Sequence, residues 1–256
     1  MRALLPVALC LGACTNEVEP PKAPNMSALV ARYTQIDGEL TPETAPRLLE
    51  ASAAKLGFLA DTEELLGLIE AVATGIANLD DATVKQEDGL AARAQPLTAA
   101  GVTIEAGAWA IYRRVCPGTG AEARPSRGKL SLTLLLTDDG FEPVVWGGLA
   151  QCLLASALRM DGDIRLRVDG LPAGITGVLV DFEGQLSQEG APWERLRFDA
   201  RYVPGEGVLT AVDVPDGGTF LVGYGFDGGV RVVDAQGPWR CDTSVCVGPD
   251  GQRVPW

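Results

Sequence analysis

The sequence predicts an α+β protein in which an N-terminal helical pair packs on a mainly antiparallel β-sheet, either barrel-like or a sandwich. Apolar residues recur at helical spacing between residues 44 and 80. From about residue 101, apolar and polar residues alternate, and Asp-Gly pairs separate the alternating stretches. Alternation with one polar face is typical of half-buried antiparallel strands. We therefore expect a mainly helical segment over residues 28–100 and an antiparallel β domain over residues 101–256.

Two helices are predicted within the helical segment. Residues 48–56 carry leucine and small side chains at helical spacing, and Gly57 is a natural end for this helix. Asp61 followed by Glu64 has the spacing of a capping box, which predicts the start of the second helix. The apolar face of that helix contains Leu65, Ile69, Val72, Ala73 and Ile76. Because each helix is apolar on one side only, we expect both to dock on another element.

Four stretches of the β domain show period-two alternation most clearly: residues 130–136, 164–168, 195–202 and 220–226. Aspartate and glycine in sequence favour tight turns between such strands. These pairs are Asp139-Gly140, Asp161-Gly162, Asp169-Gly170, Asp216-Gly217, Asp227-Gly228 and Asp250-Gly251. The spacing predicts roughly nine or ten strands.

The N-terminus has the pattern of an export signal. Arg2 is followed by a short apolar run over residues 3–10 and then by Leu11-Gly12-Ala13-Cys14. The run is shorter than the about 20 residues that a membrane-spanning helix needs. The four residues ending at Cys14 resemble the lipobox of bacterial lipoproteins. An ordinary secretory signal or a buried N-terminal helix is the alternative interpretation.

The lipobox resemblance implies how the chain is anchored. Residues 1–13 would be removed as a signal peptide, and the Cys14 thiol would carry a lipid that holds the protein on a membrane. Residues 14–27 would then form a lipidated, proline-rich tether, extended at about 3.1 Å per residue. Thr15, where an aspartate favours retention in the inner membrane, points to the outer membrane. We expect a lipid-anchored protein of the bacterial cell envelope, exposed to the periplasm or the cell surface.

The chain is acidic, with 34 Asp and Glu residues against 21 Lys and Arg and a net charge of −13. Arg2 would leave with the signal peptide and make the mature chain more acidic still. Nucleic acid is therefore not an expected partner, because phosphate binding needs clustered cations. The acidic residues are scattered, as expected for a soluble surface.

Four cysteines remain after the predicted signal: Cys116, Cys152, Cys241 and Cys246. An even number in an exported chain favours disulfides, of which three pairings are possible. We prefer Cys241–Cys246, which closes a tight loop, and Cys116–Cys152, which would join two predicted strands. A four-cysteine zinc site is the alternative, but a single Cys-x4-Cys spacing supports it poorly. We expect no metal and no cofactor.

The chain contains no histidine, which excludes a Ser-His-Asp triad, a Cys-His pair and histidine-ligated zinc. A serine–lysine dyad would be the remaining way to activate a serine. Ser52-Ala-Ala-Lys55 resembles the nucleophile motif of penicillin-binding proteins and β-lactamases, but the family's other motifs are absent. We therefore interpret Ser52 as a small core residue beside a surface lysine and predict no catalytic residue.

Five arginines fall on the polar faces of two predicted strands: Arg165, Arg167, Arg195, Arg197 and Arg201. If these strands are neighbours, the arginines form a cationic stripe that could hold an anionic glycan, lipid headgroup or partner protein. The alternative that we favour is a ladder of cross-strand ion pairs with Asp163, Asp169, Glu194 and Asp199.

The expected function is that of a non-enzymatic binding or structural module of the cell envelope, anchored through its lipid and with a protein or glycan partner. A first alternative is a carrier of an apolar or acyl-chain ligand in a half-open barrel. The carrier's cavity would be lined by Leu130, Leu132, Leu134, Phe198, Phe220 and Val222. A second alternative is a carboxylate-based hydrolase of the envelope.

Overall fold

The computed structural model describes residues 21–61, 102–105, 109–115, 128–137, 140–154, 158–170, 175–188 and 191–256. Two helices precede the sheet, α1 (Ser27–Thr34) and α2 (Ala45–Asp61). The strands are β1 (Val102–Glu105), β2 (Trp109–Val115), β3 (Lys129–Thr137), β4 (Gly140–Leu154), β5 (Leu158–Asp169), β6 (Gly177–Gln188), β7 (Glu194–Val203), β8 (Gly207–Val214), β9 (Gly218–Gly225), β10 (Val230–Asp234), β11 (Gly237–Cys241), β12 (Val245–Val247) and β13 (Arg253–Pro255).

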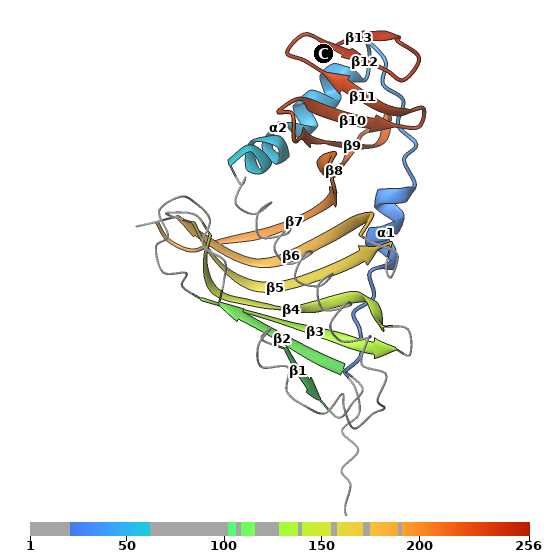
Figure 1. Cartoon of the computed structure of the whole chain (residues 1–256). Helices are drawn as coiled ribbons and strands as arrows, with labels where there is room; N and C mark the ends of the chain where they lie inside the picture. The colour runs from blue at the N-terminus through green and yellow to red at the C-terminus, as the bar shows by residue number, and fades with distance from the viewer. Residues whose placement is uncertain are drawn as a thin grey trace, which may run out of the picture.

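All thirteen strands belong to one antiparallel sheet in which each strand pairs with its neighbours in sequence. The predicted α+β class, with N-terminal helices on an antiparallel sheet, is confirmed. The sheet is open, because among the described strands β1 pairs with β2 alone and β13 with β12 alone. Figure 1 shows the long, curved strands β3–β7 below and the shorter strands β8–β13 stacked above them.

Three of the four clearest alternating stretches lie within strands β3, β5 and β7, and the fourth lies in β9 except for Phe226, which follows the end of the strand at Gly225. One predicted turn is wrong, because Asp161-Gly162 lies inside β5 rather than between strands. Gly162 is directly opposite Gly184 on β6, and a Cβ at Gly162 would come within 2.5 Å of the Gly184 Cα. The glycine therefore serves close contact between two strands and not a turn.

The helices also differ from the prediction in their bounds. α2 continues through Gly57 to Asp61, so the predicted end at Gly57 is wrong. Leu59, about one turn beyond buried Leu56, is 5% exposed and packs in the core. The burial of Leu59 offsets the roughly 1 kcal/mol by which a glycine destabilises a helix. α1 begins at Ser27, inside the segment predicted as tether, and Met26 is already buried. The predicted helix after Asp61 lies outside the described residues.

The two helices pack on opposite faces of the sheet. Apolar residues of α1 contact a cluster that includes Ala211 and Leu221. Apolar residues of α2 contact a different cluster that includes Val212 and Val222. Because successive side chains of a strand point to opposite faces, these two clusters lie on the two sides of β8 and β9. The helices thus lie on opposite faces of the sheet at β8 and β9.

The linker between α1 and α2 crosses from one face to the other past the ends of two hairpins. The Gly38 backbone N–H donates to the Thr219 carbonyl over 3.0 Å, and the Gly38 carbonyl accepts from Ala235 N over 2.9 Å. Buried Asp234 accepts from Leu40 N over 2.9 Å. A Cβ at Gly38 would lie 2.4 Å from the Phe220 ring, so only glycine fits this crossing.

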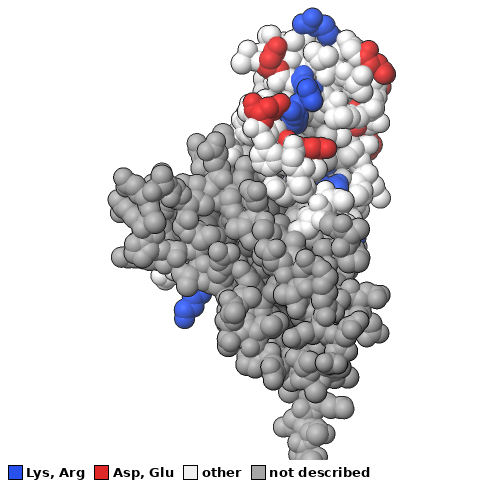
Figure 2. All heavy atoms as spheres, viewed as in Figure 1, with Lys and Arg blue, Asp and Glu red and all other residues white. Residues whose placement is uncertain are grey.

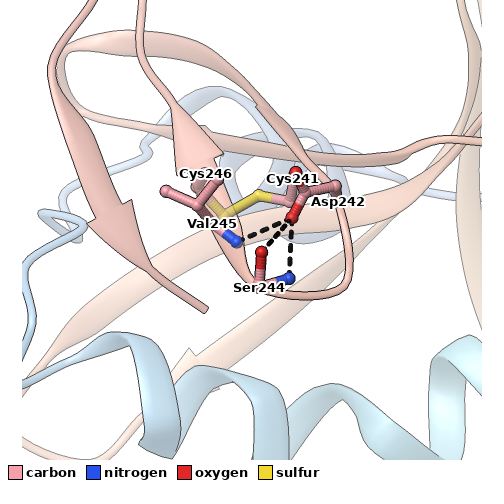
Figure 3. Close-up of a disulfide and its surroundings, with 5 residues drawn as sticks. All are labelled: Cys241, Asp242, Ser244, Val245 and Cys246. Atoms are coloured by element: carbon pink, nitrogen blue, oxygen red, sulfur yellow. Dashed lines mark hydrogen bonds between the residues drawn. A yellow bond between two sulfur atoms is a disulfide. The ribbon is translucent and has the colours of Figure 1, made fainter.

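A disulfide between Cys241 and Cys246 links β11 to β12, where the two residues are directly paired. The pairing predicted for these cysteines is confirmed, and their sulfur atoms, bonded to each other, are not zinc ligands. Asp242 shapes the loop between them by accepting from Ser244 N, Ser244 Oγ and Val245 N (Figure 3). These hydrogen bonds lower the pKa of the Asp242 carboxyl, the bond from Ser244 N most.

The second predicted disulfide, Cys116–Cys152, stays a prediction, because Cys116 lies outside the described residues. Cys152 itself is disulfide-bonded and buried. Cys14 and the predicted signal also lie outside the described residues. Among the residues that the structure does describe, no helix is long and apolar enough to cross a membrane.

Candidate functional site

The sheet splits between β7 and β8. β7 pairs with β6 through nine residue pairs, from Val178↔Tyr202 to Leu186↔Glu194. It pairs with β8 through only three, next to their shared turn, ending at Arg201↔Leu209. If the ladder continued, Asp199 would be the partner of Ala211, two residues further along each strand. In Figure 1, β8 instead rises away from β7.

Side chains from both helices replace the missing hydrogen bonds of Ala211. The Ala211 N–H donates to the Tyr33 hydroxyl over 3.3 Å. The Ala211 carbonyl accepts from Arg32 Nη2 over 3.1 Å and from Lys55 Nζ over 2.6 Å. Because a buried backbone group without a partner is costly, these side chains stabilise the split. The split is therefore a built feature of the fold and not a frayed edge.

The Asp199 carboxylate joins the same network from β7. It accepts from the Tyr33 hydroxyl over 2.6 Å and lies 3.1 Å from Arg32 Nη1. Arg32 also contacts Asp213 of β8 over 3.1 Å. Burial, followed by the nearby Asp199 charge and its hydrogen bond, raises the pKa of Tyr33 far above its ordinary value, so the hydroxyl stays protonated.

A cavity of about 680 Å³ opens beside this network. Its wall combines α1, α2 and the unpaired part of β7, and successive residues of β7 contribute from Leu196 to Asp199. Leu29, Leu59, Leu196 and Phe198 make part of its surface apolar. Pockets for small ligands in proteins commonly measure about 300–1,000 Å³ and are mostly apolar with a few polar groups. The cavity has this size and character.

Four cations of the described residues line the cavity, and two of them are neutralised by carboxylates. Arg32 is paired as described above, and Arg165 lies 3.1 Å from Asp181 and 3.4 Å from Glu183. Lys55 donates only to the Ala211 carbonyl, and no acidic group within the described ranges lies in ion-pair distance of it. Arg197 has no ion pair among these residues either. Lys55 and Arg197 are therefore the uncompensated charges of the wall.

Burial lowers the pKa of Lys55 from its ordinary value of 10.5, with a further lowering by the Arg32 charge. The carboxylates of Asp199 and Asp213 act in the opposite direction. Desolvation is the larger effect, because the side chain is partly buried and no carboxylate among the described residues is in ion-pair distance of its ammonium. An anion bound next to Lys55 would supply that counter-ion.

The five arginines predicted as a stripe lie on one face, but β5 and β7 are separated by β6. Asp181 of β6 lies opposite both Arg165 and Asp199, so acidic groups interrupt the row. Arg167 contacts Asp169 over 3.0 Å, and Arg201 lies 3.8 Å from the same carboxylate. The predicted cross-strand ladder is thus confirmed for Asp169, which contacts arginines of β5 and β7. It is wrong for Asp199, which pairs with Arg32 of α1 and not with an arginine of a strand. Arg195 and Arg197 have no ion pair within the described part of the chain.

The lining predicted for an acyl-chain cavity is largely wrong. Phe198 lines the cavity. Leu130, Leu132 and Leu134 instead belong to the core of the lower sheet, and Phe220 and Val222 pack under α2. All five are at most 2% exposed. The alternation in sequence identified buried faces correctly, but it could not separate a filled core from the wall of a cavity.

Ser52 and Lys55 do not form a dyad. Buried Ser52 donates to the Leu49 carbonyl over 3.1 Å, and Lys55 donates to Ala211 as described. Ser52 is a core residue as predicted. The description of Lys55 as a plain surface lysine is wrong, because it reaches into the split.

Two carboxylates lie in the wall, Asp181 and Asp199, and they are cross-strand partners on β6 and β7. A glycosidase needs one carboxyl as a proton donor and one as an anion. Here each carboxylate lies 3.1 Å from a guanidinium nitrogen, and Asp199 also accepts from the Tyr33 hydroxyl, so both are ion-pair partners of arginines. Across the described residues, no group of three or more potential metal ligands is found.

On the face of the upper half that Figure 2 shows, neither positive nor negative charge dominates. Figure 2 shows acidic and basic side chains interspersed over the described atoms at the top of the molecule.

Sequence reasoning missed α1 and with it Arg32 and Tyr33, which build the split. The stretch 27–34 is only eight residues long and follows a proline-rich segment, so it resembles a tether. The pattern Met26, Leu29, Val30 and Tyr33 has helical spacing and could have indicated an apolar helix face.

No family model matches this chain, and no curated protein or solved structure is significantly similar to it.

Proposed function

We propose that this chain is a non-enzymatic binding protein of the bacterial cell envelope, anchored by a lipid on Cys14, which holds an amphiphilic anion in the cavity at the β7–β8 split. The observation that supports it most is the pair of uncompensated cations, Lys55 and Arg197, in the wall of a partly apolar cavity. The other two cations of the wall already have carboxylate partners.

The charges of the wall favour an anion over a cation as ligand. A ligand carboxylate or phosphate could take Lys55 as a counter-ion and accept from the Arg197 guanidinium, which has five donors in a planar fork. A cationic ligand would meet only Asp181 and Asp199, which are already engaged by Arg165 and Arg32. The wall thus has free capacity for negative charge and none for positive charge.

The apolar part of the wall favours a ligand that also carries hydrocarbon. Leu196 and Phe198 of β7 face Leu59 of α2 on one side, and Leu29 of α1 contributes from the other. Burying apolar ligand surface contributes roughly 25 cal/mol per Å². A ligand with an acyl or aliphatic chain next to its anionic group would use both parts of the wall, which agrees with the expectation of an acyl-chain carrier.

The anchor places this cavity near a membrane. Asn25 and Met26 line the cavity and lie within residues 14–27, the predicted tether. A stretch of about eleven residues between Cys14 and Asn25 reaches at most roughly 35–40 Å when extended. An outer-membrane anchor with the domain in the periplasm or at the cell surface would thus hold the cavity within reach of envelope lipids and proteins.

The test is a calorimetric titration with dodecyl phosphate, below the concentration at which it forms micelles, and with dodecyltrimethylammonium as the cationic control. The wild-type chain should bind the phosphate and not the ammonium compound. Lys55→Met together with Arg197→Met should weaken binding at least about tenfold, since hydrogen bonds to charged groups contribute about 1.5–3 kcal/mol each.

Arg240→Met is the control for loss of a positive charge outside the cavity, because Arg240 is exposed on β11; it removes one of the two charges that the double variant loses. It should bind dodecyl phosphate as the wild type does. Equal binding of the anionic and cationic compounds, or equal weakening by Arg240→Met and the double variant, would contradict the proposal.

A further inference from the structure

The unpaired edge of β7 forms part of the cavity wall. Between Glu194 and Ala200, no described strand pairs with the edge of β7 that faces β8. From Glu194 to Arg197, β7 therefore pairs with β6 on one side, and no described strand pairs with it on the other. Such an edge carries backbone donors and acceptors that can pair with another extended chain.

The direction of these backbone groups follows from two hydrogen bonds further along the strand. The Val203 carbonyl accepts from Glu206 N in the turn, and the Asp199 carbonyl accepts from Thr210 Oγ1 of β8. Both carbonyls face the side of β8, and in an antiparallel strand alternate residues face the same neighbour. The N–H and C=O groups of Arg197 and Arg195 therefore face the open side, and the described residues offer them no hydrogen-bond partner there.

The side chains next to this edge differ between its two faces. Leu196 and Phe198 point to the face of Leu59, where the wall is apolar. Arg195 and Arg197 point to the other face and have no ion pair in the described part of the molecule. Glu183, which lies across from Arg197 on β6, already contacts Arg165 over 3.4 Å. The edge thus offers alternating cationic and apolar positions.

An added antiparallel strand would meet these positions residue by residue. Its residues opposite Arg195 and Arg197 would put their side chains on the cationic face, and the residues between them would put theirs on the apolar face. Recognition of a peptide by strand addition combines such side-chain pockets with main-chain hydrogen bonds. Charge complementarity therefore calls for acidic residues at every second position and apolar residues between them.

We propose that the ligand of the cavity is an extended peptide segment of another protein, with alternating acidic and apolar residues, which adds to β7 between Glu194 and Phe198 as an antiparallel strand. This inference rests on the proposed function and names the class of its amphiphilic anion. The open edge favours a peptide over a lipid, because a lipid chain would leave the donors and acceptors of Arg195 and Arg197 unused.

The experiment titrates the full chain with acetyl-Leu-Glu-Leu-Glu-Leu-amide and with two singly N-methylated forms of this peptide. In the predicted register, the glutamate N–H groups donate to β7 and the N–H of the central leucine points away. Methylation of the first glutamate should weaken binding at least tenfold. Methylation of the central leucine should change it less than threefold. The lysine analogue acetyl-Leu-Lys-Leu-Lys-Leu-amide should not bind.

A protein variant gives an independent reading. Arg197→Pro removes the backbone donor on the open edge, which proline tolerates at sheet edges. Arg197→Met removes the charge and keeps the donor. The two variants are compared once thermal unfolding shows that both have unfolding temperatures near that of the wild type. Arg197→Pro should then bind the glutamate peptide more weakly than Arg197→Met does.

Equal weakening by the two methylated peptides, or stronger weakening by leucine methylation, would overturn the inference. Binding of dodecyl phosphate without binding of the glutamate peptide would also overturn it and leave the proposed function standing, with a lipid-like anion as ligand. Absence of binding for both compounds would remove the proposed function as well.

Discussion

Tyr33 of α1 donates its hydroxyl hydrogen to the Asp199 carboxylate of β7 over 2.6 Å, at the point where the ladder between β7 and β8 ends. The same hydroxyl accepts from the Ala211 N–H of β8. One side chain thus links the two strands that no longer pair with each other. The split, and the cavity beside it, depend on this link.

Tyr33→Phe should lower the free energy of unfolding by about 1–3 kcal/mol, because it leaves the buried Ala211 N–H without an acceptor and removes a donor from Asp199. Urea denaturation measures the loss. Tyr224→Phe is the control, since the Tyr224 hydroxyl has no hydrogen bond with a described residue, and it should stay within about 0.5 kcal/mol of the wild type. Equal effects of the two variants would show that the link is not structural.

Asp234→Ala should destabilise the fold by about 2–4 kcal/mol, because three backbone N–H groups, those of Leu40, Gln236 and Gly237, lose a charged acceptor that is 3% exposed. Asp234→Asn keeps one carbonyl acceptor and should lose less. Exposed Asp250→Ala should be nearly neutral. Thermal unfolding ranks the three variants, and a loss for Asp250→Ala as large as for Asp234→Ala would contradict the role given to the linker.

Binding of dodecyl phosphate should fall as pH rises through the lowered pKa of Lys55. Below that pKa the ammonium is charged and attracts the anion, and above it the attraction is lost. Lys55→Arg, which stays charged, should remove this part of the pH dependence. Calorimetric titrations over pH 7–10.5 test this, and a profile shared by wild type and Lys55→Arg would contradict it.

The same pKa has a consequence for stability. Because the folded-state pKa of Lys55 lies below 10.5, the unfolded chain binds more protons between the two values, and the free energy of unfolding should rise with pH in that window. Below the folded-state pKa the full cost of burying the charged amine remains. Lys55→Met should lack this rise. In the Lys55→Met protein, the Ala211 carbonyl still accepts a hydrogen bond from Arg32, so this variant should fold.

Replacing Cys241 and Cys246 together by serine should cost about 2 kcal/mol on the chain-entropy description of a five-residue loop. Guanidinium unfolding under non-reducing conditions measures the difference. The Asp242 hydrogen bonds that shape the loop remain in this variant, so the protein should still fold. No change in stability would mean that these hydrogen bonds alone define the loop.

Metabolic labelling with a fatty-acid analogue should mark the wild-type protein in bacteria and leave Cys14→Ser unmarked. The physical reason is that Cys14 alone would carry the acyl chains. Membrane fractionation should show the wild type with the outer membrane and the Cys14→Ser protein released. Equal labelling of both forms would contradict the lipid anchor.

The sheet was predictable because alternation is a local pattern. Residues 195–202 alternate without interruption, and β7 contains them all. The Asp161-Gly162 pair misled because a glycine that allows strands to approach resembles a turn glycine in sequence. Gly57 misled in the same way, since its effect on α2 is outweighed by the burial of Leu59, a tertiary contact.

The candidate site was much less predictable. The split depends on where β8 stops pairing with β7, and nothing in residues 207–214 differs from an ordinary strand. Lys55 is 156 residues from Ala211 in sequence, and Arg32 is 179 residues from it. The five arginines were found from their alternation, but the acidic groups of β6 that neutralise Arg165 depend on the order of strands.

Photo-crosslinking locates the ligand most directly. Dodecyl phosphate with a diazirine in its chain would be bound to the wild-type protein, irradiated, and mapped by mass spectrometry of peptides. We predict labels in residues 25–32 of α1, 54–59 of α2 and 196–199 of β7, all removed by excess unlabelled dodecyl phosphate. Labels confined to β10–β13, or labels that excess competitor does not remove, would contradict a binding cavity at the split.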